Sequence, residues 1–311
     1  MYTDRIELVE VSPRDGLQNE KVQVATADKL ALIERAIAAG VRRIEATSFV
    51  NPRAVPQMAD ADAVCAGLPE RDDVTYIGLV MNQRGADRAI ETGRIDQLGA
   101  VAVATDGLGI ANQKQSSDES VEVASAIIRA AQAAGRTGQV TIAASFGCPF
   151  EGEVSEDHVV AMAGRLADAD PVEIALADTI GVGNPAHVTR LVSRVLETIA
   201  PIPVRVHFHN TRGTGLANVW AAIGAGARTV DASIGGLGGC PFAPGAAGNV
   251  STEDVVYMLE RAGIATGLDL ETLISTNHWM AGVMDKTLPA MVGKAGGFPA
   301  PKQTSNEKEI A

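Results

Sequence analysis

The sequence has 311 residues, of which 46% are hydrophobic and 21% charged, and its formal net charge is −12. The acidic balance argues against a nucleic-acid surface, which needs a basic patch, but a few local Lys and Arg side chains can still hold a phosphorylated small substrate. Neither an apolar run near the roughly 20 residues of a membrane span nor the basic-then-apolar start of a secretory signal is present, so we expect a soluble, cytoplasmic protein with no membrane partner.

Eight short apolar segments alternate along the chain with amphipathic segments of helical period. The predicted strands span approximately 6–11, 43–47, 74–79, 97–104, 139–144, 172–176, 204–208 and 229–233. The predicted helices include 26–39, 120–134, 156–167, 185–199 and 215–224, followed by two more near 252–262 and 270–283. Strict alternation predicts an α/β fold with a parallel sheet, and eight pairs predict a closed (β/α)8 TIM barrel with extra C-terminal helices. An open doubly wound sheet is the alternative.

The chain is expected to form one catalytic domain over residues 1–311, because no Pro- or Ser-rich linker divides it. The barrel core is predicted over about 6–270. From about residue 293 the tail is rich in Gly, Pro and Lys, which predicts a flexible end or a flap.

Polar and glycine-rich stretches follow most of the predicted strands. In a TIM barrel the chemistry lies where the strands end, so we expect these stretches to meet at one rim. They are residues 12–21, 45–52, 146–152, 177–183, 207–215 and 235–249.

The segment 204–215 is the predicted centre of the site. Val204, Val206 and Phe208 alternate with polar residues, which is the period of a strand, so His207 and His209 project from the same face. Two unrelated histidines are the usual meaning of such a pair. Because the chain has only five histidines and other polar stretches converge on this rim, we favour a shared metal ion.

A metal held by two neutral imidazoles also needs oxygen ligands. Asp15 is the best carboxylate candidate, although Asp-Gly is by itself a turn signal, and Asn249 can add a carbonyl oxygen. Mixed nitrogen and oxygen ligation with open positions suits Mg²⁺ or Mn²⁺, with Zn²⁺ as a further option. Arg14, beside Asp15, can neutralise an oxyanion of the substrate or form a surface ion pair.

Other polar residues of the rim have both functional and structural interpretations. Glu45 lies in an otherwise apolar strand, so its charge must be paired or face the barrel mouth. Asp178 begins the loop after strand six and either takes part in the chemistry or caps a turn. Gln18 and Lys21 can hold substrate or phosphate, or be solvated.

The three cysteines are Cys65, Cys148 and Cys240, an odd number that predicts free thiols in a reducing compartment. Cys240 lies in a glycine-dense loop that could fold over a substrate and place the thiol as acid or base, or bury it as a small hydrophobic residue. The glycine spacing is wrong for a dinucleotide fingerprint.

From residue 6 to about 263 the chain resembles the 3-hydroxy-3-methylglutaryl-CoA (HMG-CoA) lyase family, within the barrel metallolyases and acyl-CoA condensing enzymes. The motifs that carry the resemblance are PRDGLQNEK at 13–21, EATSFVNP at 45–52, GCPFEG at 147–152, DTIGVG at 178–183 and GGCPF through GN at 238–249.

The resemblance implies a site and its roles. Asp15, His207, His209 and Asn249 would bind a divalent cation, and Arg14 would stabilise an enolate. Glu45 and Asp178 would shape the site, and Cys240 would lie on the catalytic loop. Gln18, Lys21 and Asn112 are expected to contact substrate. A homodimer or higher homo-oligomer, and a place in leucine degradation and ketone body metabolism, are also implied.

The sequence departs from the family pattern at two places. The family usually has HxHDTYG after strand seven, whereas this chain has Asn210 and Arg212 at the Asp and Tyr positions. The stretch after strand four, 105–112, lacks the usual Ser-Glu and Lys pattern but keeps Asn112. These differences leave the metal set intact and bear on the acyl group, so (R)-citramalyl-CoA is the alternative substrate.

The expected reaction is a retro-Claisen cleavage of a tertiary 3-hydroxyacyl-CoA that yields acetyl-CoA and a keto acid, acetoacetate for the methylglutaryl substrate. A base, either a histidine at the metal or Asp178, takes the hydroxyl proton. Arg14 stabilises the enolate, which Cys240 or water protonates. The alternatives are an aldolase or condensing enzyme on the same barrel and a catalytically silent binding module.

Overall fold

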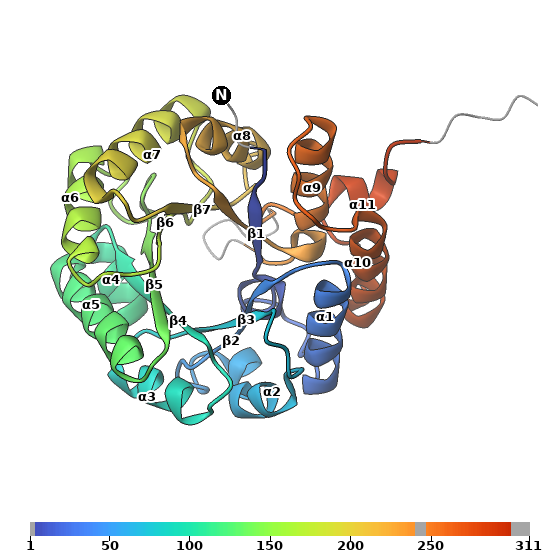
Figure 1. Cartoon of the computed structure of the whole chain (residues 1–311), viewed down its shortest axis with the longest axis horizontal. Coiled ribbons are helices and arrows are strands. Elements are labelled where there is room, and N and C mark those ends of the chain that lie inside the picture. Colours follow the sequence, from blue (N-terminus) through green and yellow to red (C-terminus); the bar gives the residue numbers. More distant parts are fainter. Residues whose placement is uncertain (1–3, 240–246, 300–311) are drawn as a thin grey trace, which may run out of the picture.

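The computed structural model describes residues 4–239 and 247–299, and its centre is a closed barrel of eight parallel strands joined in sequence order (Figure 1). The strands are β1 (Glu7–Glu10), β2 (Arg43–Ser48), β3 (Thr75–Leu79), β4 (Gln97–Val103), β5 (Thr137–Ala143), β6 (Ile174–Asp178), β7 (Val204–Phe208) and β8 (Thr229–Ala232). Because β8 pairs with β1, the sheet has no free edge. The predicted TIM barrel is therefore confirmed.

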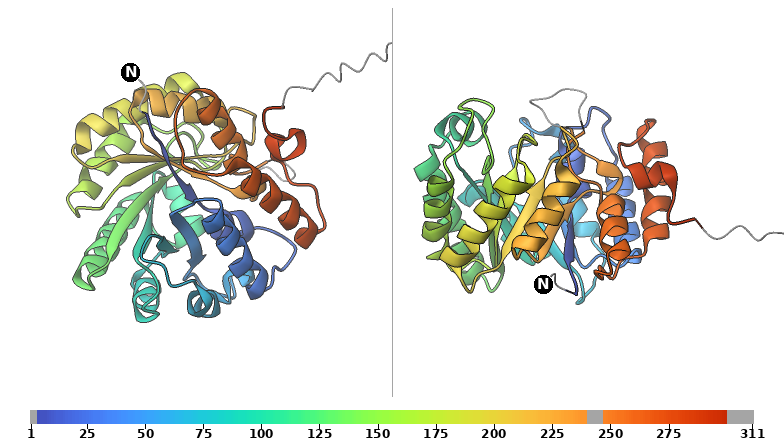
Figure 2. Two further views of the ribbon diagram at one scale, coloured as in Figure 1. Left: turned by 45° about the vertical axis from the view of Figure 1, so that its right-hand side comes forward. Right: turned by 90° about the horizontal axis from the view of Figure 1, so that it is seen from above.

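Helices surround the barrel and cover the outer face of every strand (Figures 1 and 2). The α-helices of the described residues are α1 (Thr26–Ala38), α2 (Ala61–Gly67), α3 (Gln83–Glu91), α4 (Asp106–Gln113), α5 (Ser117–Ala133), α6 (Glu156–Ala167), α7 (Pro185–Ile199), α8 (Gly215–Ala225), α9 (Thr252–Arg261), α10 (Leu270–Met284) and α11 (Met291–Ala295). Three short helical turns are η1 (Ser12–Gly16), η2 (Pro56–Met58) and η3 (Ile234–Gly236).

Local chemistry explains why several helices begin where they do. Ser155 and Asn184 precede α6 and α7, and their side chains accept the N–H groups of His158 and His187. Ser116 and Glu119 form a capping box at the start of α5. Such caps satisfy N–H groups that have no partner inside the helix, and they are readable from sequence.

Some predicted boundaries are wrong. Strand β6 is Ile174–Asp178 rather than 172–176, so Asp178 ends the strand instead of opening the following loop. Residues 105–112, expected as a loop after strand four, lie almost entirely in helix α4 (Asp106–Gln113). Helix α11 extends order beyond residue 293, and residues 300–311 of the predicted tail lie outside the described residues. The one-domain organisation stays a prediction.

The apolar core lies between the barrel and its helices. One large hydrophobic cluster fills that layer, whereas the barrel interior contributes a small cluster of Val9, Val11 and Ile77. Barrel interiors are usually packed with branched apolar residues. Here the inner faces of several strands carry charged and amide side chains instead, so the interior of this barrel is largely polar.

Candidate metal centre and active site

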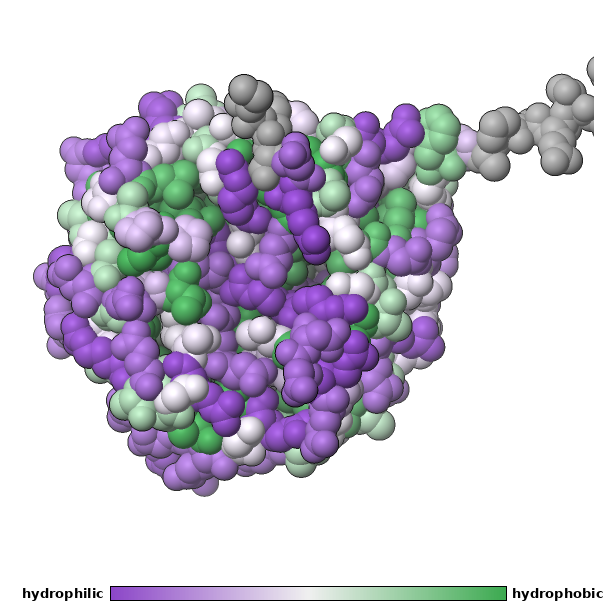
Figure 3. Space-filling model, in the orientation of Figure 1, coloured by the Kyte–Doolittle hydropathy of each residue, from purple (hydrophilic) through white to green (hydrophobic). Residues whose placement is uncertain are grey.

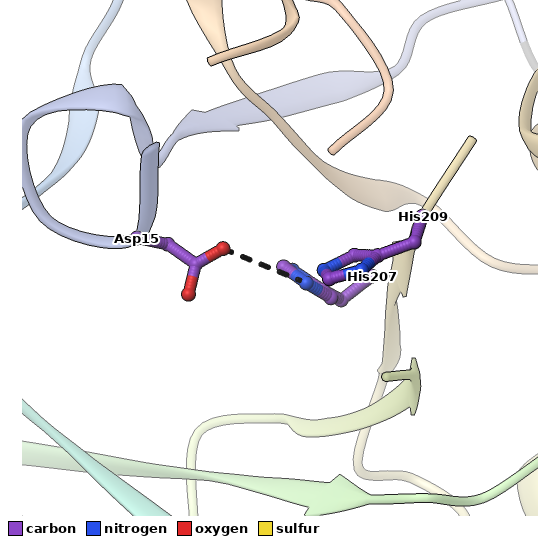
Figure 4. A group of neighbouring side chains, drawn as sticks. All are labelled: Asp15, His207 and His209. Atoms are coloured by element: carbon purple, nitrogen blue, oxygen red, sulfur yellow. Dashed lines mark ion pairs between the residues drawn. The ribbon is translucent and has the colours of Figure 1, made fainter. Parts of the chain in front are cut away.

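Three potential metal ligands converge at the ends of β1 and β7 (Figure 4). Asp15 lies on η1, directly after β1, while His207 is on β7 and His209 follows its end. One ligand atom from each residue lies within 4.8 Å of the others, and the two imidazole rings are 5.2 Å apart between centroids. The strand period thus brings both histidines to the rim, as the sequence predicts.

The Asp15 carboxylate is held ionised. Burial alone raises its pKa, but Arg14, His207 and His209, together with a hydrogen bond from Asn249, outweigh burial and hold the pKa below its ordinary value. Arg14 Nη1 lies 2.6 Å from Asp15 Oδ1, and Asn249 Nδ2 donates to Asp15 Oδ2 at 2.8 Å. A charged carboxylate is the form that a divalent cation needs.

His207 lies between two carboxylates. Its Nδ1 is 3.2 Å from Asp231 Oδ2, and its Nε2 is 3.9 Å from Asp15 Oδ2. Burial lowers the pKa of His207, but the hydrogen bond to Asp231 and the charges of Asp15 and Asp231 raise it above the ordinary value. A proton on Nδ1, donated to Asp231, leaves the Nε2 lone pair directed toward Asp15, which is the arrangement of a metal-binding histidine.

His209 is the neutral member of the cluster. Burial and the neighbouring His207 lower its pKa to about 4, so the imidazole is uncharged at neutral pH. Its Nδ1 is buried and has no hydrogen-bond partner among the described residues. A buried ring nitrogen without a partner, beside a carboxylate and a second imidazole, fits a divalent cation bound through mixed nitrogen and oxygen ligands.

Arg14 joins the cluster to Glu45 on β2. Glu45 Oε2 accepts a hydrogen bond from Arg14 Nε at 2.7 Å, and Arg14 Nη2 lies 2.6 Å from the same oxygen. Arg14 therefore bridges Glu45 and Asp15, and all three are wholly or largely buried. Of the two possibilities predicted for the Glu45 charge, pairing or facing the barrel mouth, the structure shows pairing with Arg14. The Arg14 charge is directed into the barrel mouth rather than to the surface.

Asp178 holds the loop after β6. Its Oδ1 accepts the N–H of Val182, and its Oδ2 accepts the N–H of Gly183, both at 2.9 Å. Burial raises the pKa of Asp178, although these hydrogen bonds and the charges of His207 and Arg212 lower it. The structural interpretation, capping of the following turn, therefore holds, and the carboxylate also lies close enough to His207 to interact with it electrostatically.

The remaining predicted site residues differ in how the structure places them. Asn249 is bridged to His209 through the backbone and presents its amide nitrogen to Asp15 and to the Leu237 carbonyl. Gln18 Oε1 is buried without a partner in the described part of the chain. Lys21 and Asn112 are exposed, and neither makes a hydrogen bond or ion pair with the metal cluster within residues 4–239 and 247–299. Cys240 lies outside the described residues.

The two departures after β7 serve the loops. Asn210 Oδ1 accepts the N–H of Gly215 at the start of α8. Arg212 Nη1 donates to the carbonyl oxygens of Ile180 at 2.7 Å and Gly181 at 3.1 Å, which fastens the β7 loop to the β6 loop. Both side chains therefore make loop contacts that the sequence pattern does not reveal.

Sequence reasoning missed the residues behind the cluster. Asp231 on β8 contacts His207, and Arg205 on β7 donates two hydrogen bonds of 2.6 Å to Asp231. Glu10 accepts the N–H groups of Ser12 and Ile234, so it ties the β1 and β8 rim loops together. The available signal was the same as for Glu45, namely charged residues inside predicted strands.

Comparison with known proteins gives a consistent result. The model of the family described as HMGL-like matches residues 5–280. The chain is 44% identical to an (R)-citramalyl-CoA lyase of Chloroflexus aurantiacus over 94% of its length and 95% of that protein. It is 40% identical to a hydroxymethylglutaryl-CoA lyase of Bacillus subtilis over 93% and 96%. It is also similar to the structure of an HMG-CoA lyase from Acinetobacter baumannii in complex with coenzyme A and 3-methylmalate, with a TM-score of 0.90, 42% identity and coverage of 96% and 98%.

Proposed function

The chain belongs to the HMGL-like family and is an oxo-acid lyase, and from this premise we propose that it cleaves 3-hydroxy-3-methylglutaryl-CoA to acetyl-CoA and acetoacetate. The observation that carries the proposal is the convergence of Asp15, His207 and His209 at the barrel mouth, beside the buried guanidinium of Arg14. This set offers a cation site with a fixed positive charge, the Arg14 guanidinium, in direct contact with the ligand Asp15. A retro-Claisen cleavage needs such charges to stabilise the negative charge that develops on the substrate oxygens.

The proposed cation is Mg²⁺ or Mn²⁺, held by Asp15, His207 and His209, with Asn249 as a further ligand. When bound, it would act as a Lewis acid toward the oxygens of the hydroxy acid. Arg14 supplies the second charge. Because Glu45 and Asp15 grip the guanidinium from two sides, it cannot turn away when negative charge develops on the thioester oxygen.

Asp178 is the favoured base for the hydroxyl proton. Both nitrogens of His207 already face carboxylates, whereas each Asp178 oxygen receives a single backbone N–H and keeps a free lone pair. Burial also raises the pKa of Asp178, which makes its carboxylate more basic. After the carbon–carbon bond breaks, Cys240 or water would deliver a proton to the enolate carbon, giving the methyl group of acetyl-CoA.

An acyl-CoA is the proposed substrate class. Gln18, Lys21 and Asn112 are the proposed contacts, of which Gln18 offers a buried amide oxygen in need of a donor. The 3-methylmalate in the Acinetobacter baumannii structure is a five-carbon hydroxy diacid, an isomer of the citramalyl group of citramalyl-CoA. With the 44% identity to an (R)-citramalyl-CoA lyase, this favours (R)-citramalyl-CoA as the second candidate substrate.

Product analysis separates the two substrates. Purified protein with Mg²⁺ would be given each acyl-CoA, and acetyl-CoA and the keto acid would be measured separately. Cleavage of the methylglutaryl substrate releases acetoacetate, and cleavage of citramalyl-CoA releases pyruvate. A kcat/KM at least tenfold higher for the methylglutaryl substrate is the expected result. The reverse ratio would transfer the assignment to citramalyl-CoA, and no keto acid from either would refute both.

Two variants test the chemistry. Cys240→Ala should lower kcat by orders of magnitude while far-UV circular dichroism stays unchanged. Asp178→Asn cannot take a proton, so kcat should fall at least 100-fold, and an unchanged KM and circular dichroism spectrum would separate loss of the base from loss of the N–H contact to Val182 or Gly183. Full activity in Asp178→Asn would exclude the aspartate as base and leave a histidine.

A further inference from the structure

A network of side chains with alternating charges, here called the charge network, runs through the barrel interior to the Asp15–His207–His209 cluster. Arg43 on β2 pairs with Glu173, whose Oε1 lies 3.1 Å from Arg205 Nε. Arg205 Nη1 donates to both oxygens of Asp231 at 2.6 Å, and Asp231 Oδ2 lies 3.2 Å from His207 Nδ1. The charge network therefore connects five side chains, from the amino-terminal end of the barrel to the cluster.

The two ends of the charge network, Arg43 and His207, lie on opposite faces of the barrel. The view of Figure 3 looks at the amino-terminal ends of the strands, and hydrophilic residues fill the centre of that face. Arg43 there also pairs with Glu7 at 2.9 Å and donates to Gln97 at 3.0 Å. Deeper in the barrel, the side chains of Arg205 and Asp231 are each only 4% exposed.

Burying the charge network costs free energy of folding, and a purely structural role does not explain that cost. Removing charges from water is unfavourable, and well-packed apolar residues of similar volume often stabilise a protein as well or better. A position that breaks the usual rule of an apolar barrel interior therefore indicates function. The charge network reaches the site at the contact between Asp231 and His207. These two residues are direct neighbours in the β7–β8 register.

We propose that Asp231 and Arg205 are positioning residues for the cation. Asp231 keeps the His207 proton on Nδ1, so the Nε2 lone pair is presented to the ion beside Asp15. Arg205 holds the Asp231 carboxylate in place by donating to both of its oxygens. The inference rests on the cation site of the proposed function, and its consequences concern ion binding rather than the acyl substrate.

Variants at both positions separate positioning from structural support. Asp231→Asn leaves one oxygen for two donors, Arg205 and His207, so the imidazole loses its fixed partner. Arg205→Gln removes the charge that orients Asp231, and Arg205→Lys restores one donor. Arg43→Gln is the matched control, because it removes a cation from the same network but from its far end.

The first readout is the His207 tautomer in the metal-free protein. Nitrogen-15 labelling of the five histidines and long-range proton–nitrogen correlation in alkaline buffer report which ring nitrogen carries the proton. Wild type, Arg43→Gln and Arg205→Lys should show His207 protonated at Nδ1. Asp231→Asn and Arg205→Gln should show a mixture of tautomers.

The second readout is Mn²⁺ affinity, measured by electron paramagnetic resonance of free Mn²⁺. Loss of a carboxylate behind a ligating histidine typically weakens binding 10–100-fold, which is the expectation for Asp231→Asn, with about tenfold for Arg205→Gln. Arg43→Gln should bind within twofold of wild type, and Arg205→Lys should recover most of the affinity.

Three outcomes decide the matter. Unchanged tautomer and affinity in Asp231→Asn would overturn the proposal, and so would an equal loss of affinity in Arg43→Gln. Mn²⁺ binding that responds as predicted, in a protein that cleaves neither acyl-CoA, would refute the proposed function and leave the positioning role standing.

Discussion

Glu253 on α9 offers a test of how the rim turn after β8 is held. Its carboxylate oxygens accept the N–H of Gly235 at 3.1 and 3.0 Å, and Asn277 Nδ2 on α10 donates to Oε1 at 2.5 Å. Burial raises the pKa of Glu253 to about 7, although these hydrogen bonds lower it. The perturbation is Glu253→Gln, which keeps an oxygen for the Gly235 N–H and cannot ionise.

The sign follows from proton binding. The folded pKa of about 7 lies above the ordinary value of 4.5, so the folded state binds more protons between these pH values and its stability falls as pH rises through that window. At about 1.36 kcal/mol per pKa unit, ionisation of Glu253 between pH 5 and pH 8 costs the folded state about 2.5 kcal/mol. The free energy of unfolding of Glu253→Gln, relative to wild type, should therefore rise by about 2.5 kcal/mol between pH 5 and pH 8.

The assay is urea unfolding of wild type and variant at pH 5 and pH 8, followed by circular dichroism and tryptophan fluorescence. The difference between the two proteins isolates Glu253, because all other titrating groups are shared. Glu122→Gln, which alters an exposed partner of Arg165, is the control and should show no such pH-dependent gain. A stability difference between wild type and Glu253→Gln that does not change from pH 5 to pH 8 would refute the reasoning.

Four further predictions concern the site. Asp15→Asn should weaken Mn²⁺ binding at least 100-fold in calorimetric titration, since it removes the only charged ligand of the cluster described here. Arg14→Gln should lower kcat by about 10²–10³ with a small change in KM, because its charge acts on the developing enolate. Mn²⁺ affinity should fall as pH decreases, and the fall should begin at a higher pH than for an ordinary histidine, because the raised pKa of His207 lets a proton compete for the ligand. Arg212→Ala should lower the thermal midpoint by a few degrees and leave the ratio of kcat/KM for the two acyl-CoA substrates within twofold.

The barrel was predictable because its signals are local. Apolar runs, helical periods and capping residues recur in order, and the observed α6 and α7 have the predicted bounds. The short helices α4 and α11 were missed because a few polar and glycine residues look like a loop until the surrounding structure holds them. Strand β6 was placed two residues early because Ala177 and Asp178 read as loop, although β7 pairs with both.

The cluster of Asp15, His207 and His209 was predictable for a related reason, since the strand period aligns His207 with His209. Its supporting residues were not predictable, because they depend on the pairing register of neighbouring strands. His207 lies opposite Asp231 only because β7 and β8 pair in that register. A shift of one residue would direct the Asp231 side chain to the other face of the sheet. Charged residues inside predicted strands mark Arg205 and Asp231 as unusual, but a single sequence does not show that Asp231 lies opposite His207.

The discrimination between the methylglutaryl and citramalyl substrates can be bounded in free energy. Because Asn210 and Arg212, the most visible departures from the family pattern, bind loop backbone, we expect neither of them to reject either substrate by direct contact. The two acids differ by one methylene between the carbinol carbon and the carboxylate. A methylene in a pocket is worth about 1–3 kcal/mol, or roughly 10–200-fold in kcat/KM. A measured ratio within that range therefore needs only pocket shape, whereas a ratio above about 10⁴ requires a polar group that pairs with the carboxylate of one acid and is left unpaired by the other.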